Sequence, residues 1–432
     1  MPQWGCIADD VTGATDLATN LVSRGLRTKV VLGTPGEAAI RKARTEFADV
    51  DAIVVALKTR TAPVAQAVAE SLAALRLLRA AGAARSYVKY CSTFDSTPRG
   101  NIGPVIDAVL DARGEELTVV VPSFPATGRT VYQGHLFVGD QLLSDSSMRH
   151  HPLTPMLDSS LPRLLAPQTT GTVALVPLPV VREGVAAVRA ALEDARVPGT
   201  RVHAVVDALT VEDLAVIAEA TAGLAVVTGG SGLALGLPRA GDPDAARAIT
   251  VRPGLRATLC GSASERTRAQ VAHARERVPW RKLDLGALRA DFAGHVGGIV
   301  TWARQVWAAD ATALPLVYSV DSLSDLDGDT PEGAEPASEL VERALAAVAE
   351  GLVAEGARQL VVAGGESSGR VLAELGIGAL RIGPEIASGV AWSDGVTEDG
   401  VPLNLALKSG NFGEVGMFTT AWDSLATAGA AR

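Results

Sequence analysis

Two adjacent carboxylates, Asp9 and Asp10, follow the first apolar run of the chain and are the first residues that could do chemistry. The run Gly5–Ala8 is typical of a buried strand, and a helical pattern begins directly after the two aspartates. Ligands of open α/β sheets bind outside the carboxyl ends of the strands, where both side chains would emerge. Asp also caps helices, but a cap needs one acceptor side chain rather than two. We therefore predict a functional role for this pair.

A basic patch accompanies the next strand ends. Between Lys58 and Arg129 the chain has nine Lys and Arg against six Asp and Glu, which is 9 − 6 = +3, so the remainder carries −9 − 3 = −12. Basic residues gathered in an acidic protein predict an anionic small ligand, because Arg and Lys pair with carboxylate or phosphate. A solvated helix face explains Arg76 and Arg79 but neither Lys58 nor Lys89. The predicted substrate-binding residues are Lys58, Arg60, Lys89 and Asp95.

Glycine-rich turns follow several later strands. The segments LCGSASE (259–265), VVAGGESSG (361–369) and KSGNFG (408–413) each join an apolar run to a helix or loop. Backbone N–H groups at helix starts, with hydroxyls beside them, form cradles for phosphate. One such turn is ordinary packing, but three in the second half of the chain predict a nucleotide site. Ser262 and Glu265 also have the spacing of a capping box, which predicts a helix from about residue 265.

The elements that must position these residues alternate between strand and helix. Val-rich runs such as 52–57, 117–121 and 202–206 alternate with amphipathic stretches such as 64–80 and 184–195, which predicts α/β lobes with mostly parallel sheets flanked by helices. The stretch after Leu235 is rich in Pro, Gly and Ala and has no sustained period, so we predict a linker there. The expected domains are residues 1–240 and 250–432, with a second strand and helix series in the latter.

Composition excludes several classes of protein. The chain has 432 residues, 47% hydrophobic and 20% charged, as in ordinary globular proteins of two or three domains. A net charge of −9 and 4% aromatic residues argue against nucleic-acid and anionic-membrane partners. Three scattered cysteines, an N-terminus without a basic leader and the lack of an apolar run of about 20 residues predict a cytoplasmic protein. The oligomeric state is left open, a homodimer included.

Several known site motifs are missing. The chain has no Walker phosphate loop, no G-x-S-x-G elbow and no H-E-x-x-H, and the adjacent His150 and His151 are unconvincing zinc ligands. The acidic segment 325–336 fails as an EF-hand loop because Thr330 stands where glycine is required, so we expect a solvated loop. No metal ligand can be assigned from the sequence.

Seven separated segments together resemble the four-carbon acid sugar kinase family. In chain order they are IADDVTGATD, KYCSTFDSTPRGNIGP, PATGRTVYQGHLFVGD, HPLTPM, VTGGSGL, AGGESSG and LALKSGNFG. They span residues 7–413. KYCSTFDST with GNIGP, and HLFVGD before HPLTPM, look most like 3-oxo-tetronate kinases. The chain reads Gly-Gly-Glu-Ser where many relatives read GGET, which keeps a hydroxyl.

The resemblance implies an N-terminal domain that binds a sugar acid and a C-terminal domain that binds ATP with Mg²⁺. Carried over by motif, the nucleotide site would use Ser262, Ser264, Gly364, Gly365, Glu366, Ser367 and Gly410. The implied reaction is phosphorylation of the 4-hydroxyl of a four-carbon acid, with 3-oxo-tetronate favoured over D-threonate and D-erythronate. Phosphoryl transfer benefits from a base beside the acceptor, so we expect Asp10 to be the general base, with Asp9 as second candidate.

Two other functions remain open at this point. A nucleotide-responsive sensor without turnover could use the same cradles, although the paired carboxylates favour catalysis. A nicotinamide-dependent dehydrogenase could use the turn Gly229–Gly236, but its spacing is G-x-G-x-x-x-G rather than G-x-G-x-x-G. ADP release with a panel of sugar acids, read beside NADH absorbance, separates the three.

Overall fold

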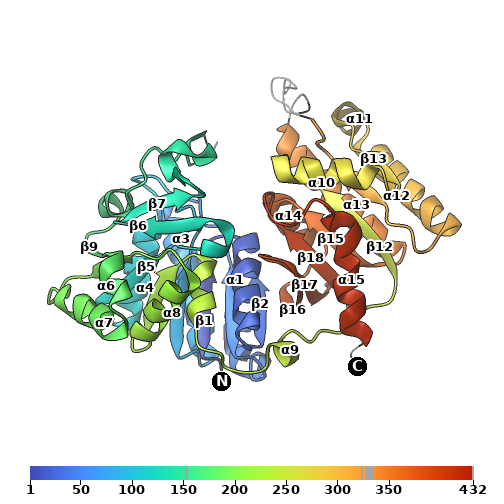
Figure 1. Cartoon of the computed structure of the whole chain (residues 1–432). Helices are drawn as coiled ribbons and strands as arrows, with labels where there is room; N and C mark the ends of the chain where they lie inside the picture. Colours follow the sequence, from blue (N-terminus) through green and yellow to red (C-terminus); the bar gives the residue numbers. More distant parts are fainter. Residues whose placement is uncertain (151–153, 323–324, 326–334, 431–432) are drawn as a thin grey trace. The chain divides into compact units, whose positions relative to one another are not determined.

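The computed structural model describes residues 1–150, 154–322, 325 and 335–430. It divides into two compact units, Met1–Arg247 and Ala248–Arg432. Figure 1 colours the first unit from blue to yellow-green and the second from yellow to red. The segment predicted to be a linker contains a short helix, α9 (Pro243–Ala246), directly before the change of unit.

The first unit is built on a parallel sheet with the strand order β2-β3-β1-β4-β11-β5-β10-β9. Its strands are β1 (Trp4–Ala8), β2 (Thr28–Leu32), β3 (Ala52–Ala56), β4 (Arg85–Lys89), β5 (Leu117–Val121), β9 (Thr172–Val176), β10 (Val202–Val206) and β11 (Val226–Gly229). Its helices are α1 (Val11–Ser23), α2 (Glu37–Glu46), α3 (Val64–Ala80), α4 (Ile102–Arg113), α5 (Leu161–Leu165), α6 (Leu178–Arg182), α7 (Val185–Asp194) and α8 (Val211–Ala220). Strands such as β5, LTVVV, are buried along their whole length because helices cover both faces of the sheet.

The strand order reverses around β1. Strand β1 pairs with β3 on one side and with β4 on the other. After β1 the chain continues to β2, on the β3 side, whereas after β4 it continues to β5, on the opposite side. The crevice at such a switch point is where ligands of open α/β sheets bind. Asp9, Asp10 and the residues that follow β3 and β4 all lie at this edge.

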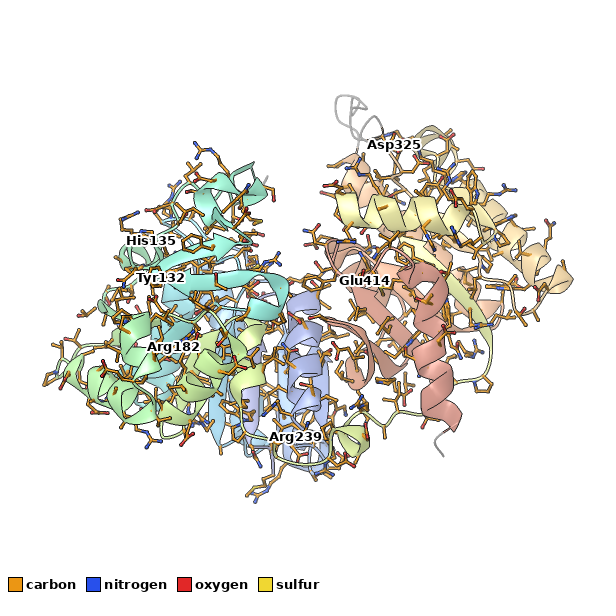
Figure 2. The ribbon with its side chains drawn as sticks, in the orientation of Figure 1. Tyr132, His135, Arg182, Arg239, Asp325 and Glu414 are labelled. Carbon is orange, nitrogen blue, oxygen red and sulfur yellow. The ribbon has the colours of Figure 1, made fainter. Side chains whose placement is uncertain are left out.

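A small antiparallel sheet, β6 (Arg129–Tyr132), β7 (His135–Val138) and β8 (Gln141–Leu142), belongs to the same unit. Its first turn is held by the buried Asp207 carboxylate, which accepts hydrogen bonds from the Gln133 and Gly134 amides at 2.6 and 2.9 Å. Figure 2 labels Tyr132 and His135 on either side of this turn.

The second unit has the strand order β13-β14-β12-β15-β18-β17-β16. These strands are β12 (Leu255–Cys260), β13 (Trp280–Lys282), β14 (Leu316–Tyr318), β15 (Ala357–Ala363), β16 (Ala379–Ala387), β17 (Val390–Val396) and β18 (Pro402–Lys408). Pairing is parallel from β13 to β18 and antiparallel from β18 to β16. The helices are α10 (Glu265–Arg275), α11 (Leu285–Ala290), α12 (Phe292–Ala309), α13 (Ala337–Ala354), α14 (Gly365–Glu374) and α15 (Met417–Ala430), several of which flank the sheet in Figure 1.

The predicted fold class is confirmed, since each unit has a mostly parallel sheet between helices. Over the described residues, no helix is long and apolar enough to span a bilayer. His151 and most of the acidic segment 325–336 lie outside the described residues, so the expectations for them stay expectations.

Candidate functional site

Three neighbouring strand ends bring the predicted residues of the first unit together. Ala8 at the end of β1 is in register with Ala56 of β3 and with Lys89 of β4. The next peptides are also joined, because the Asp9 carbonyl accepts hydrogen bonds from the Thr59 and Arg60 amides at 3.0 and 3.3 Å. The aspartates that follow one strand therefore face cations at or after the ends of its two neighbours.

The charged side chains form one ion network. The Arg60 guanidinium donates to both carboxylate oxygens of Asp9, through Nε at 2.8 Å and Nη2 at 2.9 Å, and Nη2 also reaches Asp10 Oδ1 at 2.7 Å. Lys89 Nζ lies 3.2 Å from the same Asp10 oxygen and 3.9 Å from Asp9 Oδ1. The Lys89 side chain is 4% exposed, so its charge depends on these partners.

Asp9 and Asp10 experience different surroundings although they are adjacent. Burial raises the pKa of Asp9, and the attraction of Arg60 and Lys89 offsets this rise only in part. Burial also acts on Asp10, but the two cations and the hydrogen bonds from Thr12 and Gly13 outweigh it, so the pKa of Asp10 lies well below its usual range. Asp10 is the N-cap of α1, with Oδ2 accepting from the Gly13 amide at 3.1 Å. One carboxylate thus holds a helix start while the other has the higher proton affinity.

Asn101 fixes the loop that carries Arg60. Its Nδ2 donates to the carbonyls of Thr59 at 2.6 Å and Ala62 at 2.8 Å, with a longer contact to the Arg60 carbonyl at 3.3 Å. Asn101 occupies the N-cap position of α4, but its side chain makes no cap hydrogen bond. This role of Asn101 was not predicted from the sequence. An Asn directly before a helix was visible as a signal, but its partners forty residues away were not.

The loop after β4 supplies a third carboxylate. Asp95 Oδ1 accepts a hydrogen bond from the Thr93 hydroxyl at 2.6 Å, and Oδ2 lies 3.8 Å from Arg60 Nη1. Phe94 between them is fully buried and has φ +51°, a left-handed conformation that is uncommon for a bulky residue. Strained backbone of this kind persists where the surrounding structure enforces it, often at functional sites.

These residues line a narrow cavity of about 30 Å³. Its polar lining includes Asp9, Thr59, Arg60, Lys89, Asp95, Ser96 and Asn101. Asp10 and Lys58 are not among the lining residues, and Lys58 is exposed to solvent. The predicted substrate-binding residues Arg60, Lys89 and Asp95 are therefore brought together, whereas Lys58 stands apart from them.

In the second unit the three predicted cradles meet at the carboxyl end of the sheet. Cys260, Ala363 and Lys408 end the adjacent parallel strands β12, β15 and β18 in register. The turns that follow are tied by the Gly261 amide, which donates to the Ala363 carbonyl at 2.9 Å, and by the Gly364 amide, which donates to the Lys408 carbonyl at 2.8 Å. Three segments that are well separated in the chain thus meet at the carboxyl end of the sheet.

Two glycines at this end of the sheet, Gly364 and Gly410, lie where neighbouring turns come very close. Gly364 has φ +123°, and a Cβ there would lie 3.2 Å from the Ser262 amide nitrogen and 3.1 Å from Ser367 Oγ. A Cβ on Gly410 would lie 2.8 Å from Ser262 Oγ and 3.0 Å from Ser264 Oγ. The three turns are therefore packed closely against one another, which leaves little room for a side chain at Gly364 or Gly410.

The other predicted nucleotide residues lie on α14. Gly365 is its first residue, Glu366 is exposed, and Ser367 is buried against Gly261, where a Cβ would clash with its hydroxyl. The predicted capping box is wrong. Ser264 is the N-cap of α10 and accepts from the Thr267 amide, because the helix begins at Glu265 and Ser262 is left in the turn.

The glycine turn after β11 has a packing role. A Cβ on Gly230 would lie 2.7 Å from the Pro122 carbonyl oxygen, and Gly229 and Gly232 approach the Val121 and Ser123 carbonyls as closely. The chain continues into a short 3₁₀ helix, Ser231–Gly236. Glycines that face neighbouring backbone leave no reason to assign a dinucleotide to this turn.

Comparisons with known proteins place both units in one family. Residues 4–237 match the family model for a sugar-binding N-terminal domain, and residues 257–418 match that for a nucleotide-binding C-terminal domain. The chain belongs to the four-carbon acid sugar kinase family. The resemblance predicted from the seven segments is thereby confirmed.

Curated relatives align over almost their whole length. A 3-oxo-tetronate kinase of Burkholderia multivorans is 48% identical, covering 98% of this chain and 97% of the relative, and one of Cupriavidus necator is 47% identical, covering 97% and 96%. A solved structure from Salmonella typhimurium LT2, described as a tRNA synthase, superposes with a TM-score of 0.85 at 41% identity, covering 98% of this chain and 99% of that one.

Within the described residues, no three His, Cys, Asp or Glu side chains are grouped as a metal site. Mg²⁺ in kinases is usually held by substrate phosphates together with one or two protein carboxylates. Such an ion supplies charge that stabilises the transferring phosphoryl group.

Proposed function

We propose that this chain transfers the γ-phosphoryl group of ATP to the 4-hydroxyl of a four-carbon sugar acid, with 3-oxo-tetronate as the acceptor. The observation that carries the proposal is the cavity of the sugar-binding unit, where Arg60 and the nearly buried Lys89 face Asp9. The choice of 3-oxo-tetronate over D-threonate or D-erythronate rests on curated relatives of that name at 41–48% identity.

Arg60 and Lys89 are suited to hold the carboxylate of the acceptor. Arg60 offers a planar fork of donors, and its hydrogen bonds now go to Asp9 and Asp10. An incoming carboxylate would compete for these donors and leave Asp9 less tightly paired. Acceptor binding would thus prepare the base as well as orient the substrate.

Asp9 is the better candidate for general base, in place of Asp10, which ranked first on sequence. Asp9 lines the cavity and has a raised pKa, whereas Asp10 is committed to the start of α1. In the proposed step O4 attacks the γ-phosphorus, the bond to the β-phosphate oxygen breaks, and Asp9 takes the hydroxyl proton. ADP and the 4-phosphate are the products.

The nucleotide belongs to the second unit. We propose that the carboxyl end of its sheet holds the phosphates of ATP with Mg²⁺. The turns there contain Ser262, Ser264, Gly364 to Ser367 and Gly410. A sensor without turnover would also bind ATP, but it would need no carboxylate of raised pKa in an acceptor cavity.

The test is an ADP-release assay with 3-oxo-tetronate, D-threonate, D-erythronate and erythrose, run beside NADH absorbance. The expected result is ADP release with the acids, fastest with 3-oxo-tetronate, and a product phosphorylated at O4 by ³¹P NMR and mass spectrometry. ATP binding with no ADP release on any acid would favour the sensor, and NADH formation would favour a dehydrogenase. Asp9→Asn is the matched variant for background hydrolysis.

A further inference from the structure

Lys408 is a fully buried lysine at the end of β18 that lies outside the predicted site set. Its side-chain nitrogen donates to Thr267 Oγ1 at 2.8 Å, to the Ser409 carbonyl at 2.9 Å and to the Gly410 carbonyl at 2.8 Å. These are three acceptors for the three protons of an ammonium group. Lys408 therefore binds the turn that follows its own strand.

The Gly410 carbonyl is held from three sides. It accepts hydrogen bonds from Ser264 Oγ at 2.5 Å and from Thr267 Oγ1 at 2.8 Å, in addition to Lys408. In a trans peptide the N–H group points away from the carbonyl, so the amide of Asn411 is directed away from α10. Asn411 is exposed, and the rest of the loop is fastened by Gln270, which donates to the Gly413 carbonyl and to that of Glu414, labelled in Figure 2.

The charge of Lys408 has no carboxylate partner. No ion pair joins it to Asp or Glu in the part of the chain that the structure describes. The charged and titratable groups that act on it are Arg266 of α10, which repels it, and the Cys260 thiol of β12, which burial keeps protonated by raising its pKa to about 12. A buried cation without a counter-ion is costly unless an anion binds nearby.

We propose that Lys408 is a positioning residue, which orients the Ser409–Gly410 turn toward a nucleotide phosphate and supplies that turn with positive charge. The proposal rests on the proposed function, because the phosphate is that of the bound nucleotide. It assigns to Lys408 a role that a neutral residue of the same length could not fill.

Proton linkage follows from this geometry. Burial lowers the pKa of Lys408 to about 8, so the ammonium loses its proton within an accessible pH range. A bound phosphate would favour the charged form and raise this pKa, so nucleotide binding should take up a proton above pH 8. Affinity should then fall by up to about tenfold per pH unit above that point.

The experiment measures the Kd of ADP with Mg²⁺ by calorimetry from pH 7.5 to 9.5, in two buffers of different ionisation enthalpy. The nucleotide phosphates, with pKa about 6, stay ionised throughout this range. Wild type should show proton uptake and weaker binding at high pH. Lys408→Met should bind at least tenfold more weakly at pH 7.5 with little pH dependence, and Lys408→Arg should recover affinity without the alkaline loss, because Arg stays charged. The exposed Lys42→Met on α2 is the control.

Thermal unfolding of each variant checks that it folds, and the wild-type proton uptake needs no variant at all. Tight ADP binding with a flat pH profile in wild type, or wild-type affinity in folded Lys408→Met, would overturn this proposal and leave the kinase function standing. Failure of wild type to bind ADP or ATP at any pH would overturn both together.

Discussion

Gly13 and Lys89 share a space that a single methyl group would fill. A Cβ on Gly13, in the first turn of α1, would clash with the Lys89 ammonium at the end of β4 and with Asp10 Oδ1. The glycine lets a helix start approach a buried cation without a side chain between them. The contact links the N-cap of α1 to the network that holds Arg60 and Asp9.

Gly13→Ala should therefore damage the acceptor site more than the nucleotide site. The added methyl must displace Lys89 or α1, and overpacking of this kind costs about 1–3 kcal/mol. We expect the acceptor KM to rise at least tenfold while the ATP KM stays within twofold. Gly297→Ala in α12 is the control, because nothing lies within 4 Å of its Cβ, and it should gain up to about 1 kcal/mol of stability. Unchanged acceptor kinetics in Gly13→Ala would show that Lys89 does not contact the substrate.

The charged cluster of the first unit was largely predictable because β1, β3 and β4 run parallel, so residues at and after their carboxyl ends must meet. Asp9, Arg60 and Lys89 do so. Lys58 does not join them, although it lies two positions before Arg60, as do residues on one face of a strand. Strand β3 ends at Ala56, so the alternation no longer holds where Lys58 lies.

The residues that hold the turns in place could not be predicted from the sequence. Asn101 and Lys408 act on backbone carbonyls of turns whose shape depends on tertiary packing, and no residue pattern marks such acceptors. Phe94 adopts a left-handed conformation that is unusual for its residue type. The capping box failed for a similar reason, since Ser262 and Ser264 are both plausible caps and only the helix start at Glu265 decides between them.

Asp9→Asn and Asp10→Asn should give different kinetic defects. A general base contributes about 10²–10⁴-fold, so Asp9→Asn should lose that factor in kcat with little change in either KM. Asp10→Asn keeps a capping side chain, since Asn caps about as well as Asp, but leaves Lys89 with a weaker partner. We expect it mainly to change the acceptor KM. The reverse pattern would return the base role to Asp10.

The pH dependence of kcat/KM is a second test of whether Asp9 or Asp10 is the general base. The pKa of Asp9 is raised, chiefly by burial, and a base works only when it is deprotonated. Wild-type kcat/KM should therefore fall as the pH drops through a pKa above the ordinary Asp value of about 3.9. The pKa of Asp10 is lowered instead, so activity that persists well below that value would point to Asp10.

Asn101→Ala should act through Arg60 without touching the substrate. The change leaves the Thr59 and Ala62 carbonyls without their donor, which costs about 1–3 kcal/mol for buried groups. We expect kcat/KM for the acceptor to fall tenfold or more, with ATP affinity unchanged by calorimetry. Asn101→Asp presents an acceptor to the same carbonyls and should be at least as damaging. If the Asn101→Ala variant is stable and fully active, the position of Arg60 does not depend on Asn101.

Gly364→Ala should impair the nucleotide site selectively. Gly364 has φ +123°, which L side chains rarely adopt, and its Cβ would press on the Ser262 amide and the Ser367 hydroxyl. The ATP KM should rise tenfold or more while the acceptor KM holds. Gly378→Ala in the same unit has open space around its Cβ and serves as the control. Wild-type ADP affinity in Gly364→Ala would move the phosphates away from this turn.

Arg60→Ala tests how the enzyme selects the chain length of its acceptor. If Arg60 and Lys89 hold the substrate carboxylate, the distance from this clamp to the base sets the chain length that is phosphorylated. Erythrose, which lacks the carboxylate, should be a poor substrate of wild type because it cannot pair with Arg60 and Lys89. Five-carbon acids should place their terminal hydroxyl past Asp9. Arg60→Ala should raise the acceptor KM far more than the ATP KM and should narrow the gap between the acid and erythrose. Equal wild-type activity on erythrose and on the acid would exclude the clamp, whereas a preference for D-threonate would change only the identity of the acid.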